Sequence, residues 1–157
     1  MKNYNILPLR IGVGIVLLND KNKVLVGKRI DNPKNFWQLP QGGVDDNENY
    51  LNAAKRELEE ETSIKSVELI KELDGWLKYD LPENLIGKIW NGKYGGQKQK
   101  WFIMKFLGND NEININTEHP EFLEWKWIEL DKITDFVVDF KLNIYKEIKE
   151  KVKKIIS

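Results

Sequence analysis

Cysteine is absent from the chain, and histidine occurs only once. Without thiols the chain can form no disulfides, iron–sulfur sites or thiolate metal sites, and a single histidine excludes most His-based metal sites and catalytic triads. Long apolar runs are also missing, because no stretch approaches the roughly 18 apolar residues that a membrane-spanning helix needs. Any catalysis must therefore use carboxylates, lysine or arginine, hydroxyls or a bound metal.

A chain of 157 residues has the size of one ordinary domain, so we expect a single domain spanning 1–157. Its composition, with 41% hydrophobic and 32% charged residues, is typical of a globular protein. Residues 1–8 lack the basic and then apolar segments of a signal peptide. We therefore expect a cytoplasmic protein that does not contact membranes.

Several short apolar runs predict β-strands. Residues 10–18 and 23–29 are rich in Val, Ile and Leu and flank the turn-forming residues 19–22, which predicts a β-hairpin. Further β-like runs are 67–77, 99–107 and 122–128, and loop-like segments are 31–46 and 87–96.

Two other segments predict helices. Residues 49–62 contain no Gly or Pro and place Leu51, Ala54 and Leu58 on one stripe. Residues 140–156 alternate Ile or Val with Lys or Glu at helical spacing. Strands, an internal helix, further strands and a closing helix predict an α+β or layered αβα domain.

Glu57, Glu60 and Glu61 are spaced i, i+3 and i+4, so they share one face of the predicted internal helix. Like charges at this spacing repel, and the helix dipole disfavours anions near a C-terminal end. The cluster is either a solvated acidic face or a site for a hard cation such as Mg²⁺, which prefers oxygen ligands. Gly42 and Gly43, a flexible turn before the helix, would let the backbone approach a ligand closely and favour the cation site.

The same segment resembles the Nudix box, whose pattern is G-x5-E-x7-R-E-U-x-E-E-x-G-U with U apolar. Ser63 stands where the pattern has glycine. Because that glycine would end the helix with a positive φ, we expect a shifted or looser C-cap here, without loss of a ligand. The matching residues are Gly42, Glu48, Arg56, Glu57, Leu58, Glu60, Glu61 and Ile64.

The resemblance implies the Nudix fold: an αβα sandwich with a mixed sheet, a loop–helix–loop at 42–64 and a C-terminal helix. It also implies a hydrolase of phosphoanhydride bonds that uses Mg²⁺, or Mn²⁺, held by the three helix glutamates. In the family pattern Glu48 and Arg56 form a structural ion pair. Glu121 matches a further glutamate that binds metal or acts as the base, and the identity of the base stays open.

Segments outside the box are similar to one branch of this family, which acts on the 5′-triphosphate end of RNA or on dinucleoside polyphosphates. The resemblance implies conversion of triphosphorylated RNA to a 5′-monophosphate with release of pyrophosphate, which promotes mRNA decay. The alternative is hydrolysis of diadenosine tetraphosphate or a related dinucleotide. No stable protein partner is implied. The segments are RIGVGIV from Arg10, WQLPQGG from Trp37, GQKQKWF from Gly96, PEF from Pro120, WKW from Trp125, and Phe140-Lys141.

The flanking basic and aromatic residues have two interpretations. Lysines and arginines are either ordinary solvated charges or contacts to a polyphosphate chain, and tryptophans are either core residues or stacking surfaces for a nucleobase. We expect His119 to be a loop residue. The candidate substrate-binding residues are Arg10, Arg29, Gly42, Gly43, Lys100 and Lys141, with Trp76, Tyr79 and Trp90 as candidates for stacking.

Net charge is zero, since 25 basic residues balance 25 acidic ones, but the charges are segregated along the chain. Residues 1–29 carry six basic and one acidic residue, and residues 30–64 carry three basic and eight acidic. Residues 86–105 carry five basic and no acidic residues, and residues 141–157 six basic and two acidic. An acidic segment flanked by basic ones suits a polyphosphate, which must meet metal ions and basic side chains together.

Overall fold

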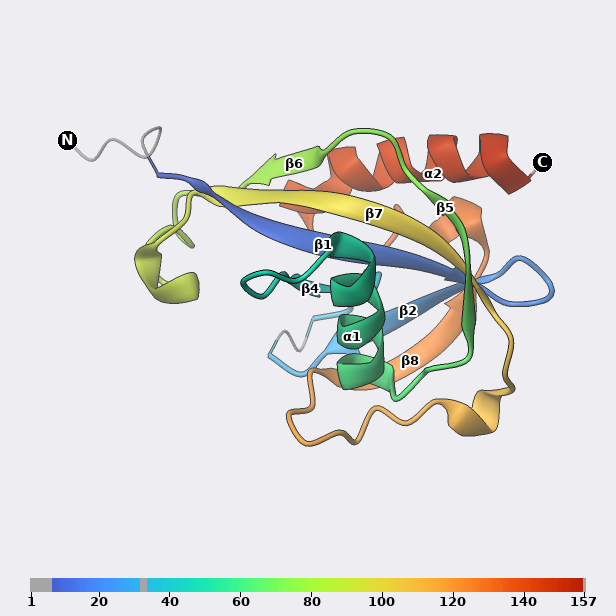
Figure 1. Ribbon diagram of the computed structural model, residues 1–157. Helices are drawn as coiled ribbons and strands as arrows, with labels where there is room; N and C mark the ends of the chain where they lie inside the picture. Colours follow the sequence, from blue (N-terminus) through green and yellow to red (C-terminus); the bar gives the residue numbers. More distant parts are fainter. Residues whose placement is uncertain (1–6, 32–33, 157) are drawn as a thin grey trace.

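The structure, a computed structural model, describes residues 7–31 and 34–156 and is built on one mixed sheet between two helices (Figure 1). The expectation about residues 1–8 concerns residues that lie mostly outside this part. No helix of the described residues is long and apolar enough to cross a bilayer. The strands are β1 (Leu9–Leu18), β2 (Val24–Arg29), β3 (Trp37–Gln38), β4 (Gln41–Gly43), β5 (Val67–Glu72), β6 (Leu77–Asp80), β7 (Gly96–Phe106) and β8 (Phe122–Ile128), and the α-helices are α1 (Tyr50–Thr62) and α2 (Leu142–Ile156).

Strands β1 and β7 form the centre of the sheet. They pair in parallel from Leu9 and Gly96 to Leu18 and Lys105, and the crossover between them contains α1. All other pairings are antiparallel, with the order β3-β2-β1-β7-β5 and with β4 on β1, β6 on β7 and β8 on β2. The predicted hairpin is present as β1 and β2.

Each face of the sheet carries its own core because neighbouring residues of a strand point to opposite faces. Ile15 and Leu17 of β1 belong to the core that includes Leu58 of α1. Val16, between them, belongs to the core that includes Tyr145 of α2. The predicted αβα sandwich is therefore confirmed, with one helix on each face (Figure 1).

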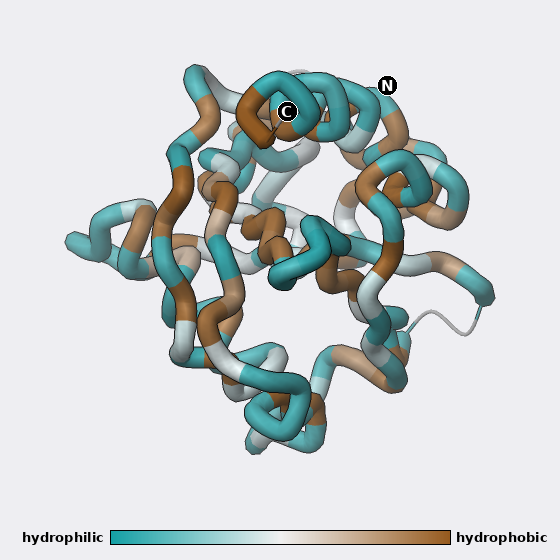
Figure 2. The backbone as a smooth tube through the Cα atoms, turned by 90° about the vertical axis from the view of Figure 1, so that its right-hand side faces the viewer, coloured by the Kyte–Doolittle hydropathy of each residue, from teal (hydrophilic) through white to brown (hydrophobic). Residues whose placement is uncertain are grey.

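Helix α2 covers its face of the sheet with an apolar stripe. Ile144, Tyr145, Ile148 and Val152 are buried at helical spacing, whereas the lysines between them lie toward solvent. Figure 2 looks onto the C-terminal end of this helix and shows brown and teal segments alternating along its turns. The predicted closing helix is confirmed, although residues 139–141 form a separate 3-10 turn, η5 (Asp139–Lys141), before it.

Three predicted boundaries were wrong. The run 67–77 is two strands, since a bend at Asp74 and Gly75, where Gly75 has a φ of 74°, separates β5 from β6. Strand β7 begins at Gly96 rather than at Gln99, because its first residues continue the pairing with β1. The loop-like segment 31–46 contains the short strands β3 and β4, and its residues 32–33 lie outside the described part.

The C-cap of α1 is not shifted, contrary to the expectation from the sequence. The helix ends at Thr62, and Ser63 takes the left-handed conformation itself, with φ 67° and ψ 7°. Its N–H donates to the carbonyl of Glu59 at 2.8 Å, and its hydroxyl donates to the carbonyl of Asn114 at 2.8 Å. The serine thus occupies the conformation that favours glycine, and its hydroxyl gains a hydrogen bond there.

Candidate active site

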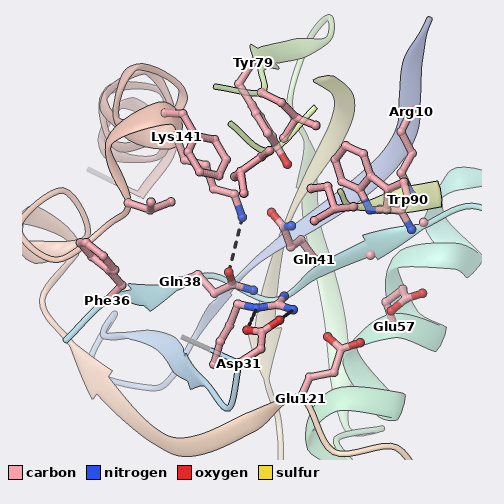
Figure 3. A pocket seen from close by; sticks show the side chains of 18 of the residues that line it. Arg10, Asp31, Phe36, Gln38, Gln41, Glu57, Tyr79, Trp90, Glu121 and Lys141 are labelled. Atoms are coloured by element: carbon pink, nitrogen blue, oxygen red, sulfur yellow. Dashed lines mark hydrogen bonds and ion pairs between the residues drawn. The ribbon is translucent and has the colours of Figure 1, made fainter. Parts of the chain in front are cut away.

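A cavity of about 660 Å³ gathers side chains from distant parts of the chain (Figure 3). Arg10 comes from β1, Glu57 from α1, Glu121 from the residue before β8, and Lys141 from η5. The tertiary structure therefore brings a glutamate of the acidic helix into one cavity with basic residues from segments before and after that helix. Of the residues proposed from the sequence, those that line the cavity are Arg10, Arg29, Gly42, Gly43, Glu57, Glu121 and Lys141, together with Tyr79 and Trp90.

Other candidates lie outside this cavity lining. Lys100 Nζ is 3.8 Å from Glu72 Oε2 and 5.1 Å from the centre of the Trp76 ring, and neither Lys100 nor Trp76 lines the cavity. Glu60 is exposed on the helix surface, and His119 is exposed in a loop, as expected. Lys100 and Trp76 thus belong to a different surface.

The two box glycines lie in strand β4 and not in a flexible turn, which corrects the expectation from the sequence. Gly43 pairs with Gly12 of β1. A side chain at Gly42 would clash with the carboxylate of Glu57, and one at Gly43 would clash with the guanidinium of Arg10. The glycines are needed because an acidic and a basic side chain both approach this strand closely.

Arg56 joins most of the acidic segment. Its Nε and Nη2 donate to the two carboxylate oxygens of Glu48 at 2.8 and 2.9 Å, and this contact holds the pKa of Glu48 down at about 2. Its Nη1 donates to Glu57 at 2.9 Å and to Glu60 at 3.2 Å, and its Nη2 also donates to the carbonyl of Gly43 at 3.0 Å. The structure thus contains the ion pair that the resemblance implies and extends it to two helix glutamates.

Glu61 is a buried carboxylate with incomplete hydrogen bonding. The residue is only 2% exposed. Its Oε1 accepts a hydrogen bond of 3.3 Å from the N–H of Gln41, whereas Oε2 has no hydrogen-bond partner among the described residues. Burial, followed by the charges of Glu121 and Glu57, raises the pKa of Glu61 well above its usual range. Burial also raises the pKa of Glu57, to about 7.

These carboxylates fit a divalent cation. An unpartnered buried oxygen beside two further carboxylates costs free energy, and a cation with oxygen ligands would offset that cost. The described residues do not form a complete group of three or more Asp, Glu, His or Cys ligands. Glu57 and Glu60 are instead turned toward Arg56.

Two polar pairs in the cavity involve residues that the sequence analysis did not identify. Asp31 accepts two hydrogen bonds of 2.7 Å from Arg29, and Gln38 accepts one of 3.4 Å from Lys141. Lys141 is only 6% exposed, and burial, together with the charge of Arg29, lowers its pKa to about 7. Two features of the sequence could have identified these residues: Asp31 stands two residues after Arg29, and Gln38 belongs to the WQLPQGG segment.

The glutamines of the GQKQKWF segment hold cavity residues in place. Gln97 and Gln99 are fully buried. Gln97 accepts a hydrogen bond of 2.9 Å from Arg10 and donates one of 2.7 Å to the Tyr79 hydroxyl, while Gln99 donates to Gln41 at 3.1 Å. The segment therefore acts on the cavity through its glutamines.

A mixed sheet between two helices, with a glutamate-rich helix facing arginines across a cavity, is the arrangement expected of a Nudix protein. The family description "NUDIX domain" matches residues 8–148, so the chain belongs to the NUDIX family. The RNA pyrophosphohydrolase of Pelagibacter ubique (strain HTCC1062) is 72% identical over 151 residues, which cover 96% of each chain. That of Orientia tsutsugamushi (strain Boryong) is 45% identical over 148 residues, covering 94% of this chain and 92% of its own.

Solved structures agree with this fold. The E. coli dihydroneopterin triphosphate pyrophosphohydrolase superposes with a TM-score of 0.68 at 20% identity, covering 92% of this chain and 99% of its own. A C. elegans Ap4A hydrolase binary complex superposes with a TM-score of 0.62 at 19% identity, covering 91% of this chain and 98% of its own. At these identities the likeness concerns the fold alone.

Proposed function

We propose that the chain is an RNA pyrophosphohydrolase: it converts the 5′-triphosphate end of RNA to a 5′-monophosphate, releases pyrophosphate and so promotes mRNA decay. The observation that carries this proposal is the cavity in which Arg10 and Arg29 lie with Glu57 and Glu121. The choice of RNA is supported by the 72% identity to a relative with that name.

Four glutamates, Glu57, Glu60, Glu61 and Glu121, would hold Mg²⁺ or Mn²⁺. The unpartnered Oε2 of Glu61 supports this assignment, and ligation by Glu57 and Glu60 requires their carboxylates to turn away from Arg56. A divalent cation held there would neutralise polyphosphate charge and would lower the pKa of the attacking water. One of the four carboxylates acts as the general base that accepts the proton of this water.

The basic side chains position the substrate. Arg10 is held between Gln97 and the Trp90 ring, with Cζ 5.1 Å from the ring centre, so its planar fork is ordered before a phosphate binds. Arg29 adds positive charge to the same cavity, and so does Lys141 in its protonated form. The aromatic lining offers stacking surfaces for the nucleobases that accompany the polyphosphate.

The substrate is tested by comparing turnover of 5′-triphosphorylated RNA and of diadenosine tetraphosphate under identical conditions. We expect a higher kcat/KM for the RNA, with a monophosphorylated RNA and pyrophosphate as products. Both substrates present a nucleotide with a flexible polyphosphate, so the same cavity could accept either. A large preference for the dinucleotide would contradict the proposal and identify the chain as a dinucleoside polyphosphate hydrolase.

Metal ligation is tested with Glu60→Gln. Because Glu60 is exposed, the variant should fold normally yet lose activity by at least about 10²-fold, since a neutral amide is a poor ligand for a hard cation. Glu59→Gln is the matched control on the exposed face of the same helix and should keep full activity. Chelation by EDTA should abolish turnover, and added Mg²⁺ should restore it. Full activity of Glu60→Gln would refute its assignment as a ligand.

We also propose a cytoplasmic location, because an mRNA substrate is found there. We further propose that residues 1–157 form a single domain, which is supported by the two cores sharing one sheet.

A further inference from the structure

Three lysines gather on the face of the sheet opposite the cavity. Strand β7 directs Gln97 and Gln99 toward the cavity side, so Lys98 and Lys100, which alternate with them, lie on the other face. Lys78 of β6 is the cross-strand partner of Lys98. We call Lys78, Lys98 and Lys100 the lysine face. It lies on the side of the sheet that α1 covers, because Phe102 and Met104, on the same face of β7, pack in the core of α1.

Trp76 holds two of these ammonium groups close together. The Nζ atoms of Lys98 and Lys100 lie 5.0 and 5.1 Å from the centre of its ring, so they are at most about 10 Å apart, within one Debye length at 0.1 M salt. The Trp76 ring also packs nearly perpendicular to the ring of Tyr50, with centres 5.3 Å apart. Trp76 therefore orients the lysines by cation–π contacts and leaves little of its own surface for a base.

Carboxylates balance this charge only in part. Within the described residues, the lysine face makes a single ion pair, between Lys100 and Glu72 at 3.8 Å. Asp80, two residues after Lys78 on the same face of β6, forms no ion pair with these lysines. Lysines directly opposite each other on neighbouring strands destabilise a sheet. The fold thus keeps an unfavourable concentration of positive charge, which an anion would relieve.

The lysine face is continuous with the mouth of the cavity. Arg10 reaches into the cavity, whereas the next residue, Ile11, is 42% exposed on the other face and pairs with Lys98. Among the described residues, strand β4 covers the edge of β1 only at Gly12–Gly14, so residues 9–11 form an open edge between the two faces in this part of the chain. A polyanion that leaves the cavity beside Arg10 can cross this edge and reach Lys98 directly.

We propose that the lysine face binds the phosphodiester backbone of RNA downstream of the 5′ end that is hydrolysed. This inference rests on the proposed function, since it extends the same substrate beyond the cavity. Lysines contact phosphates without reading bases, so the site adds affinity for longer RNA independently of sequence. It adds nothing for a substrate too short to cross the edge of β1.

The kinetic test compares two triphosphorylated RNAs with one 5′ sequence: a trinucleotide and an unstructured RNA of roughly 25 nucleotides, longer than one small binding site. Lys98→Glu should raise KM for the long RNA by at least about fivefold, with kcat unchanged and with both constants for the trinucleotide unchanged. Lys146→Glu, a matched charge reversal on the exposed side of α2, should change none of these values.

A binding test separates this inference from the proposed function. We expect the plot of log Kd against log salt for a 5′-hydroxyl RNA of the same length to become shallower by about 1.4 in Lys78→Ala/Lys98→Ala, since each phosphate contact contributes about 0.7. A wild-type protein that binds RNA in this way but does not hydrolyse triphosphate ends would refute the proposed function alone.

Two results would overturn the inference. An equal loss with the trinucleotide would place the lysines in the cavity's own binding site. If the lysine variants kept the wild-type KM and salt dependence with the long RNA, the lysine face would not bind RNA. An acidic protein surface would then be the remaining candidate partner.

Discussion

Arg56 holds Glu48 in a two-pronged ion pair that is only partly shielded from water, with side chains 26% and 17% exposed. The pair fixes the segment that leads from β4 into α1, because Glu48 Oε1 also accepts from the N–H of Asp45 at 3.0 Å. Single side chains of this kind set the position of the acidic helix relative to the strand before it.

The first prediction concerns the pH dependence of this pair. The pKa of Glu48 falls from its ordinary value of 4.5 to about 2 on folding, so the pair stabilises the protein above pH 4.5 and loses this effect as the pH falls toward 2. Glu48→Gln should lower the free energy of unfolding at pH 7 by about 1 kcal/mol. Urea unfolding at several pH values should show that the difference in free energy of unfolding between Glu48→Gln and wild type disappears in acid. Asp46→Asn, the control, should have the free energy of unfolding of wild type at every pH.

The second prediction concerns Ser63, whose left-handed backbone costs a non-glycine residue about 1–2 kcal/mol. Ser63→Gly relieves this cost but loses an exposed hydrogen bond to Asn114, so it should raise stability by about 0.5 kcal/mol. Ser63→Ala keeps the strained backbone and loses the hydrogen bond, so it should be the least stable of the three. Thermal unfolding would measure the order, and an alanine variant as stable as wild type would contradict it.

At the scale of elements, the short strand β4 brings the acidic helix to the basic strand β1. Its two glycines leave room for the Glu57 carboxylate on one side and for the Arg10 guanidinium on the other. Strand β7 has a similar double role, because its glutamines support the cavity and its lysines lie on the opposite face.

The third prediction compares the two glycines. Gly42→Ala should displace the Glu57 carboxylate and lower kcat/KM on triphosphorylated RNA by about 10²-fold, since small misplacements of catalytic groups cost that much. Gly43→Ala meets the flexible end of Arg10, which can move, so its loss should stay below about tenfold. Steady-state kinetics would test the order, and equal effects would contradict the role given to Gly42.

At the scale of the molecule, the two helices are fastened to the sheet through separate cores. The link between α2 and the WQLPQGG segment is a hydrogen bond, in which the N–H of Leu39 donates to the Tyr145 hydroxyl at 2.8 Å. Both residues are fully buried, and Leu39 directly follows Gln38 in the cavity wall. The C-terminal helix thereby supports the cavity wall without lining it.

The fourth prediction is that Tyr145→Phe destabilises the whole domain. The change leaves a buried N–H without its partner, which costs about 1–3 kcal/mol. At about 2–4 °C for each kcal/mol in a domain of this size, the midpoint of thermal unfolding should fall by about 2–12 °C. Tyr94→Phe is the control, since its hydroxyl has no hydrogen-bond partner among the described residues. A fall of equal size in the control would refute the role of the Leu39 contact.

Local contacts are the part of the fold and site that could be predicted. The helix 49–62, the shared face of its glutamates and the ion pair between Glu48 and Arg56 depend on residues within about four helical turns of each other. The strand break at Gly75 was missed because an isolated glycine in an apolar run does not by itself reveal a bend. The strands in the segment 31–46 were missed because they are very short.

The sequence alone determined the family, the αβα fold and the residues of the acidic helix, because the box is a local pattern with fixed spacing. The tertiary structure alone decided which flanking residues meet that helix. Glu61 and Lys141 became buried, and Lys100 came to lie away from the cavity while Gln99, its neighbour, supports it. The physical reason is that burial and facing are set by the pairing of β1 with β7 and by the packing of α2, which join residues far apart in the chain.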